Sequence, residues 1–199
     1  ARIQNHKNKD DLVVFYGSST LRLWKELKQD FPSMNTLNLG FGGAFIDDLS
    51  KNFDRLFNFK APKAIVLYLG GNDLSLGWTA EKIVQQINQL IEKIHHKYPG
   101  TAIVNLSIKP SMERFEQLDT LFQINRMMAE QAKRDPLLVQ IDYVEAIFQK
   151  GGVKQEFFLQ DGLHFNTKGY QLLKKHLDQH FFSRGFPLHF SHRKEQIKR

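Results

Sequence analysis

The chain has 199 residues, of which 41% are hydrophobic and 25% charged, and this size and composition fit one globular domain while excluding collagen, coiled-coil and intrinsically disordered classes. Cysteine is absent, which excludes disulfides and thiolate metal sites, and no apolar run approaches the roughly 18 residues that cross a bilayer. The net charge of +7 comes from the ends, since residues 1–9 hold three basic and no acidic side chains and residues 182–199 hold five basic and one acidic.

Short runs rich in apolar residues alternate with longer amphipathic stretches along the chain. The short runs are nearly continuous in apolar residues, as expected for strands that are buried on both faces of a sheet. Strands are predicted at residues 12–16, 36–39, 64–69, 102–108 and 137–141. Helices are predicted at residues 20–28, 46–57, 79–97, 115–133 and 167–181, the first of them short. This alternation is typical of an α/β protein with a five-stranded parallel sheet and crossover helices.

We therefore expect a single domain over residues 10–181, between basic tails at residues 1–9 and 182–199. The body is balanced in charge, so no nucleic-acid partner is expected. Stable membrane insertion is not expected either, because no apolar run is long enough to cross a bilayer. No apolar signal core follows the N-terminus, which favours a cytoplasmic protein. Because the first residue is Ala1 rather than Met, a periplasmic or secreted location, with a signal that was removed, is the alternative. The sequence does not indicate an oligomeric state.

Polar turns that contain glycine follow the first three predicted strands, at residues 17–19, 40–43 and 70–73. A doubly wound sheet binds ligands at the carboxyl ends of its strands, so these turns are expected to converge. Nucleotide-binding patterns are missing from them. The position where Gly-x-Gly-x-x-Gly needs its last glycine holds Phe45, and neither a P-loop nor a Gly-x-Ser-x-Gly elbow occurs.

A serine hydroxyl in the first turn becomes a nucleophile only if a base removes its proton. Asp161 and His164 lie in the loop before the last predicted helix. Their Asp-x-x-His spacing lets the carboxylate fold back on the imidazole Nδ1, which leaves Nε2 free to accept a proton. An isolated Asp-x-x-His pair is also common in surface loops, so the hypothesis of a Ser-His-Asp arrangement rests on the pair together with the turns.

The order of these blocks resembles the SGNH hydrolase family, also called GDSL esterases and lipases, over nearly the whole body of the chain. The four letters of that name correspond to Ser19, Gly43, Asn72 and His164. A narrower likeness to a bacterial branch of the family rests on two blocks, Gly-Ser-Ser-x-x-Arg-Leu-Trp from Gly17 and Ser-Ile-Lys-Pro-Ser in the fourth strand-to-helix connection. The resemblance implies a flavodoxin-like three-layer α/β/α sandwich.

One position departs from the family pattern. The family usually has aspartate before its serine, whereas this chain has Ser18, so two hydroxyls stand side by side. Ser19 is the predicted nucleophile because it stands two residues after Gly17, as the family serine does. Ser18 is then a turn residue, and it remains the alternative nucleophile.

The resemblance implies a serine esterase or acylhydrolase that cleaves carboxylic esters through an acyl-enzyme on Ser19 and needs no cofactor and no metal. In this interpretation His164 is the general base and acid, and Asp161 orients its ring. The oxyanion hole would consist of the backbone N–H groups of Ser19 and Gly43 and the side-chain amide of Asn72.

Arg22, Lys109 and Arg114 are candidates for the rim of the pocket, where they would bind a polar or anionic part of the substrate; each is equally readable as a surface or helix-capping charge. The expected partner is a small-molecule ester, with a short acyl or acetyl group because the loops are short. The alternative function is a noncatalytic carbohydrate- or lipid-binding module that retains the fold. Nucleic-acid binding through the basic ends is a further alternative, and both alternatives rank well below the esterase.

Overall fold

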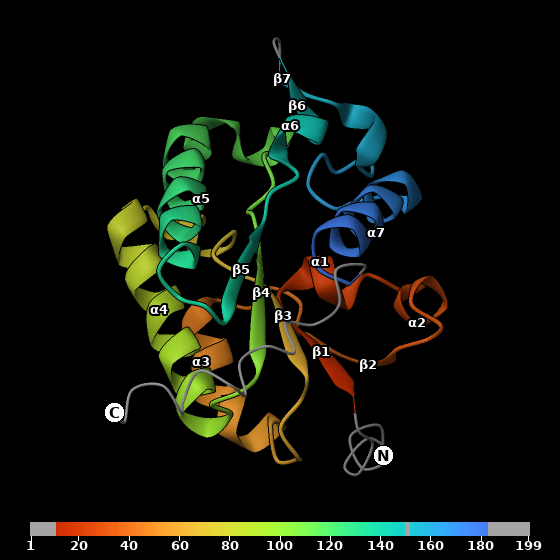
Figure 1. The fold of residues 1–199 in the computed structure, drawn as a ribbon. Helices are drawn as coiled ribbons and strands as arrows, with labels where there is room; N and C mark the ends of the chain where they lie inside the picture. The colour runs from red at the N-terminus through yellow and green to blue at the C-terminus, as the bar shows by residue number, and fades with distance from the viewer. Residues whose placement is uncertain (1–10, 150–151, 183–199) are drawn as a thin grey trace.

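The computed structural model describes residues 11–149 and 152–182, so the predicted tails lie outside the described residues except for Phe182. The described chain forms the predicted three-layer α/β/α sandwich (Figure 1). Its central sheet has five parallel strands in the order β2-β1-β3-β4-β5. The strands are β1 (Leu12–Gly17), β2 (Asn35–Gly40), β3 (Ala64–Tyr68), β4 (Ala102–Leu106) and β5 (Leu138–Ile141).

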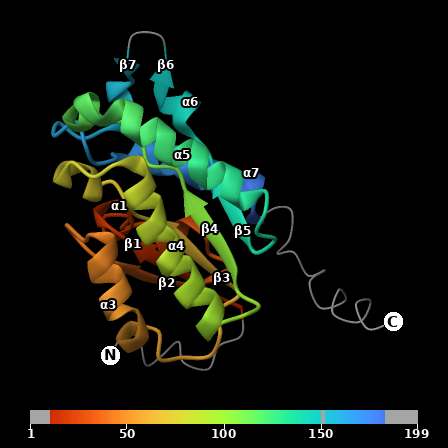
Figure 2. The ribbon, with the colours of Figure 1, turned by 90° about the vertical axis from the view of Figure 1, so that its left-hand side faces the viewer.

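Helices cover both faces of the sheet. One face packs against α3 (Ile46–Leu56), α4 (Ala80–Lys97) and α5 (Leu118–Ala132), which lie side by side in Figure 2. The other face packs against α1 (Ser19–Arg22), α2 (Leu27–Asp30), α6 (Val144–Ile147) and α7 (Thr167–His180). Successive strand residues point to opposite faces, so Val14 belongs to the first core and Val13 to the second. This is why β1 and β3, which are buried on both faces, hold no charged or amide side chain.

The amphipathic pattern of α4 has the structure that its sequence predicts. The side chain of Thr79 caps the helix by accepting the N–H of Lys82 at 3.3 Å. Its apolar stripe is buried against the sheet and consists of Ile83, Ile87, Leu90, Ile91 and Ile94. The cap and the stripe together set where this helix begins and which face it buries.

The helix predicted at residues 20–28 is instead two short helices, α1 and α2, with a turn around Trp24 between them. The indole of Trp24 is buried, with ring centroids 5.9 Å from Phe15 and 5.3 Å from Tyr170. Its Nε1 donates to Asp30 Oδ2 at 2.6 Å. The tertiary contacts of Trp24 therefore interrupt the single helix that the local sequence predicts for residues 20–28.

Residues 142–166 contain short elements that the sequence does not predict. After α6 come the antiparallel pair β6 (Phe148–Gln149) and β7 (Gly152–Val153) and the 3-10 turn η4 (Gln155–Phe157). Two further 3-10 turns, η2 (Asp73–Leu76) and η3 (Met112–Gln117), precede α4 and α5. Elements of two to six residues are too short to show a hydrophobic period.

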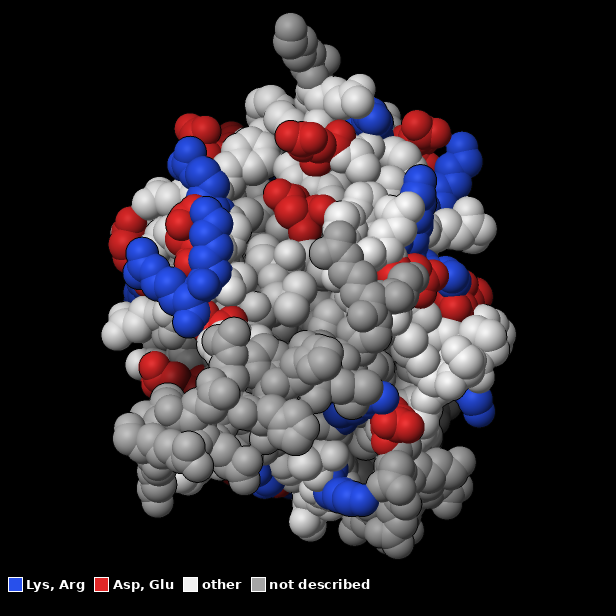
Figure 3. All heavy atoms as spheres, in the orientation of Figure 1, with Lys and Arg blue, Asp and Glu red and all other residues white. Residues whose placement is uncertain are grey.

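The surface of the described domain mixes both signs of charge. Figure 3 shows basic and acidic side chains next to each other on one face, in keeping with the balanced charge of the body. Within residues 11–149 and 152–182, no helix has both the length and the apolar character that crossing a membrane requires.

Gly17, the last residue of β1, supplies a test of the close approach between β1 and β3. An added Cβ at Gly17 would lie 2.1 Å from the carbonyl oxygen of Tyr68, whereas at Gly100 it would meet nothing within 4 Å. We expect Gly17→Ala to lower the free energy of unfolding by about 3 kcal/mol or more, because the new Cβ is fixed to the backbone of β1 and the atom that it meets belongs to the backbone of β3. Gly100→Ala is the matched control and should change it by less than about 0.5 kcal/mol in chemical denaturation. Equal stabilities of the two variants would refute this close contact.

Candidate active site

Hydrogen bonds join the three glycine-containing turns at the carboxyl ends of β1, β2 and β3. The N–H of Ser18 donates to the carbonyl of Tyr68 at 2.9 Å, which ties the first turn to β3. The N–H of Phe41 donates to the carbonyl of Gly17 at 2.7 Å, which ties the second turn to the first. The turns therefore converge at one edge of the sheet, where parallel α/β folds place their ligand sites.

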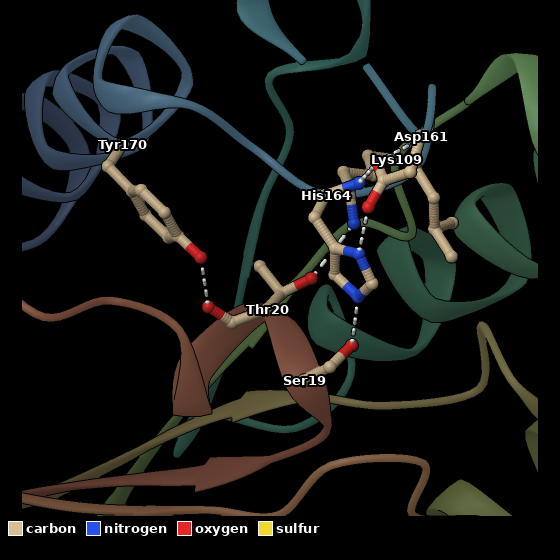
Figure 4. Close-up of polar contacts among 7 residues, drawn as sticks. Ser19, Thr20, Lys109, Asp161, His164 and Tyr170 are labelled. Atoms are coloured by element: carbon tan, nitrogen blue, oxygen red, sulfur yellow. Dashed lines mark hydrogen bonds and ion pairs between the residues drawn. The ribbon is translucent and has the colours of Figure 1, made fainter. Parts of the chain in front are cut away.

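Ser19, His164 and Asp161 form a continuous chain of hydrogen bonds at this edge (Figure 4). Ser19 begins α1, and its Oγ lies 3.0 Å from His164 Nε2. His164 Nδ1 lies 2.7 Å from Asp161 Oδ2. The contacts thus link a turn at the N-terminal end of the chain to a loop 145 residues later. The imidazole of His164 faces the Ser19 hydroxyl.

The carboxylate of Asp161 determines which imidazole nitrogen carries the proton. Its Oδ1 accepts the backbone N–H groups of Leu163 and His164, both at 2.9 Å. The other oxygen, Oδ2, faces Nδ1 and can only accept, so the proton of the neutral ring is assigned to Nδ1. The lone pair of Nε2 then points at the Ser19 hydroxyl and can take its proton.

The same contacts keep Asp161 ionised. Partial burial raises the pKa of this carboxyl, but the hydrogen bonds from the His164 backbone and ring and from the Leu163 backbone outweigh that effect and lower it to about 2. Hydrogen bonds of this kind stabilise the charged form of a carboxylate. A negative charge is therefore present beside the ring whenever His164 takes up a proton.

The loop that carries Asp161 and His164 is anchored at both ends. Asn166 caps α7 by accepting the N–H of Gly169 at 3.2 Å, and its amide donates to the carbonyl of Phe158 at 3.0 Å. Across the loop, the N–H of Leu159 donates to the carbonyl of His164 at 2.8 Å. These hydrogen bonds fix the loop backbone that carries the His164 imidazole.

Each of the three predicted oxyanion donors has an N–H without an acceptor in the described part of the chain. The N–H groups of Ser19 and Gly43 donate to no acceptor within the described part of the chain. Gly43 has φ +70°, a conformation that glycine adopts without strain. Asn72 Nδ2 donates one hydrogen to the carbonyl of Ala44 at 2.9 Å, and Arg114 donates to Asn72 Oδ1 at 3.0 Å. These two partners fix the orientation of the amide, and its second N–H is free to donate.

The three predicted rim residues occupy different environments. Arg22 is exposed and lies against the second turn, since a Cβ at Gly42 would be 2.7 Å from its Nε. Arg114 is half-buried and contacts the third turn. Lys109 does not reach the rim: its residue is 3% exposed, and its amine points inward and donates to Thr20 Oγ1 at 2.8 Å. The interpretation of Lys109 as a rim residue is therefore wrong, because residues 107–111, which follow β4, are buried.

Two other residues support the elements around the site: Tyr170, which was not predicted from the sequence, and Asp73, for which a structural role is expected. The hydroxyl of Tyr170, on α7, donates to the carbonyl of Thr20 at 2.9 Å. Asp73 Oδ1 accepts the N–H of Ile46 at 3.1 Å, so Asp73 supports the start of α3, and burial raises the pKa of its carboxyl. Tyr170 and Thr20 are 150 residues apart, and no spacing pattern marks such a contact.

Other histidines do not build a metal centre within residues 11–149 and 152–182. His95 Nε2 pairs with Asp135 Oδ2 at 2.9 Å, and His176 stacks on His180 with ring centroids 5.9 Å apart. No group of three or more candidate ligands occurs in this part of the chain. The His189 and His192 pair in the C-terminal tail lies outside the described residues.

The pKa of Asp161 tests the contact between Asp161 and His164. Replacing the ring by His164→Ala removes the side-chain hydrogen bond and leaves the two backbone N–H donors, so we expect the carboxyl pKa to rise above its value of about 2. Carbon-13 NMR titration of the carboxyl measures this change. The control is Ser19→Ala, which leaves the contact between Asp161 and His164 intact and should not change the pKa of Asp161. The same pKa in both variants would show that the ring does not stabilise the carboxylate.

Comparison with known proteins agrees with this fold. The model of the GDSL-like Lipase/Acylhydrolase family matches residues 10–172. A search of curated protein sequences finds no match.

Solved structures with the same fold cover most of the chain. A Streptococcus pneumonia protein named for platelet activating factor is 24% identical, with 89% of this chain and 90% of that chain covered and a TM-score of 0.76. A Bacteroides fragilis protein assigned as an acylhydrolase is 16% identical, with 89% and 92% covered and a TM-score of 0.77. A carbohydrate esterase family 3 protein from Talaromyces cellulolyticus is 16% identical, with 87% and 97% covered and a TM-score of 0.68. The family model spans most of the chain, and this protein therefore belongs to the GDSL-like lipase/acylhydrolase family, as its sequence predicts.

Proposed function

We propose that this protein is a carboxylic ester hydrolase that works through an acyl-enzyme on Ser19. The family and the fold support a hydrolase function. The observation that carries the finer proposal is the hydrogen-bonded chain from Ser19 through His164 to Asp161. A noncatalytic binding module has no need of a base held 3.0 Å from a serine hydroxyl and oriented by an ionised carboxylate.

Acylation begins when Ser19 Oγ attacks the ester carbonyl carbon and forms the new C–O bond. His164 Nε2 takes the hydroxyl proton as the attack proceeds. The ring then carries a positive charge beside the carboxylate of Asp161, which stabilises it. When the tetrahedral intermediate collapses, the bond to the alcohol breaks and His164 returns the proton to the leaving oxygen.

The negative charge of the tetrahedral intermediate needs donors that already point at it. We assign this role to the N–H groups of Ser19 and Gly43, which donate to no acceptor within residues 11–149 and 152–182, and to the second N–H of the Asn72 amide. Because Arg114 holds the amide oxygen, Asn72 does not have to reorient during the reaction. Deacylation repeats the sequence with water as the nucleophile, and His164 acts as base toward that water.

The substrate is proposed to be a small ester with a short acyl or acetyl group. A pocket with a volume of about 460 Å³, which is in the range of small-molecule sites, borders the proposed triad at Asp161, and neither Ser19 nor His164 lines it. It is lined partly by Met112, Leu159, Asp161 and Gly162. Exposed apolar side chains on its wall, Met112 and Leu159, would contact an uncharged part of the ester. Both the acylhydrolase and the carbohydrate esterase among the similar structures support an ester substrate.

Comparison of Ser19→Ala with Ser18→Ala tests the nucleophile. We expect Ser19→Ala to lower kcat for p-nitrophenyl esters by about 10⁴-fold or more, because it removes the attacking atom. Ser18→Ala is the matched control: Ser18 acts through its backbone N–H and carbonyl, which alanine keeps. Hydrolysis of esters from acetate to palmitate measures both variants and the preferred acyl length. Activity that depends on Ser18 alone would shift the nucleophile by one residue, and turnover by Ser19→Ala at the wild-type rate would refute the mechanism.

The amide of Asn72 gives a second test, of the oxyanion hole. Asn72→Ala removes one donor and should lower kcat by about 10² to 10³-fold with little change in KM. Arg114→Met retains the Asn72 amide and only releases its oxygen, so it should lower kcat less than Asn72→Ala does. Steady-state kinetics with p-nitrophenyl acetate measures both, and circular dichroism checks that each variant is folded. An Asn72→Ala protein with an unchanged kcat would remove Asn72 from the oxyanion hole.

A further inference from the structure

Lys109 is a buried cation directly behind the catalytic serine. It follows β4, its residue is 3% exposed, and its ammonium donates to Thr20 Oγ1 at 2.8 Å and to the Tyr68 hydroxyl at 3.1 Å. Figure 4 shows its side chain reaching Thr20 next to the contact between Ser19 and His164. All of these partners are neutral oxygens.

The groups around Lys109 are the sequence neighbours of the proposed catalytic residues. Thr20 directly follows Ser19 on α1, and Phe165 directly follows His164. The Lys109 ammonium lies 5.2 Å from the centroid of the Phe165 ring, so one side chain contacts both segments. These segments are otherwise far apart along the chain, and the serine-to-histidine hydrogen bond requires them to stay in register.

Tyr68, the third residue that Lys109 contacts, connects the lysine to the sheet. Tyr68 is the last residue of β3, and its carbonyl accepts the N–H of Ser18. Its ring centroid lies 4.9 Å from the Lys109 ammonium. Lys109 therefore connects β3, the turn that carries Ser19 and the loop that carries His164 through the end of one side chain.

Burying the Lys109 ammonium among neutral groups costs electrostatic free energy, which suggests that this lysine does more than fill space. Within residues 11–149 and 152–182 no carboxylate forms an ion pair with Lys109. A buried ammonium without such a partner is expensive unless dipoles and ring faces compensate it. Burial alone would raise the pKa of Tyr68, but the charge and hydrogen bonds of Lys109, together with the charge of Arg114, outweigh burial and lower it. An apolar side chain of similar length would fill the same space at a smaller electrostatic cost.

We propose that Lys109 is a positioning residue, which holds Thr20 and Phe165 so that Ser19 Oγ and His164 Nε2 stay within hydrogen-bond distance. This inference rests on the proposed function, since it concerns the geometry of the same nucleophile and base. Reactivity at a serine falls steeply when the attacking oxygen and its base move apart, and a misplacement of about 1 Å costs on the order of 100-fold in rate. Lys109 does not touch the substrate in this account.

A double-mutant cycle on the link from Lys109 to Thr20 tests the proposal. Lys109→Met keeps the length and apolar volume of the stem and removes the donor, whereas Thr20→Val keeps the shape of the acceptor residue and removes its hydroxyl. Two assays are run on each variant. The first is steady-state hydrolysis of p-nitrophenyl acetate, which gives kcat and KM, and the second gives the rate constant for covalent inactivation of Ser19 by a p-nitrophenyl phosphonate. The second rate reports the reactivity of the serine without demands on substrate specificity.

We expect each single variant to lower kcat and the inactivation rate by about tenfold to 100-fold, with KM nearly unchanged. The double variant should be no slower than Lys109→Met, because the two changes break the same link. The control is Lys93→Met, at a partly exposed lysine that bonds Ser50 O and Asp54 on the α3 side of the fold, and it should leave both rates at the wild-type value.

Two results would overturn the proposal. One is a folded Lys109→Met protein with wild-type rates, which would make Lys109 a packing residue only; if this variant does not fold, wild-type rates in Thr20→Val lead to the same conclusion. The other is strictly additive losses in the double variant. Failure of the proposed function looks different, since a wild-type protein that neither hydrolyses the ester nor reacts with the phosphonate would overturn both proposals together.

Discussion

Gly17 lies between two strands at the point where the chain leaves the sheet, opposite Gly40 of β2 on one side and Tyr68 of β3 on the other. The approach to Tyr68 is so close that a Cβ at Gly17 would overlap the carbonyl oxygen. This contact sets the position of Ser18 and Ser19, because the next N–H along the chain donates to that same oxygen. With β1 between β2 and β3, the three turns open on one edge at the place where the strand order reverses.

The second half of the site comes from a separate segment and has to be fitted to this edge. The loop with Asp161 and His164 is ordered by its own hydrogen bonds, through Asn166 and Leu159. Its alignment with Ser19 depends on contacts across the fold, of which Tyr170 on the Thr20 carbonyl is one. Local structure therefore shapes the base, and tertiary contacts bring it to the nucleophile.

Sequence reasoning is accurate where the information is local and fails where partners are distant. The five strands and the long helices follow from hydrophobic period and length, and the Asp161 to His164 contact follows from a spacing of three residues. The family assignment follows from the order of short blocks, and the family model agrees with it. Lys109 was misplaced because its partner Thr20 is 89 residues away, and nothing local to Lys109 marks it as buried behind a turn. Trp24 interrupts a predicted helix for the same reason, since its position is decided by Phe15 and Tyr170.

The covalent intermediate on Ser19 is the central claim, and it is observable directly. The most direct measurement is rapid acid quenching of the wild-type protein during turnover of p-nitrophenyl acetate, followed by peptide mass spectrometry. The account predicts an acetyl group on Ser19, formed at least as fast as steady-state turnover and missing from Ser19→Ala. Turnover without any acetylated serine, or with the acetyl group on Ser18, would contradict it.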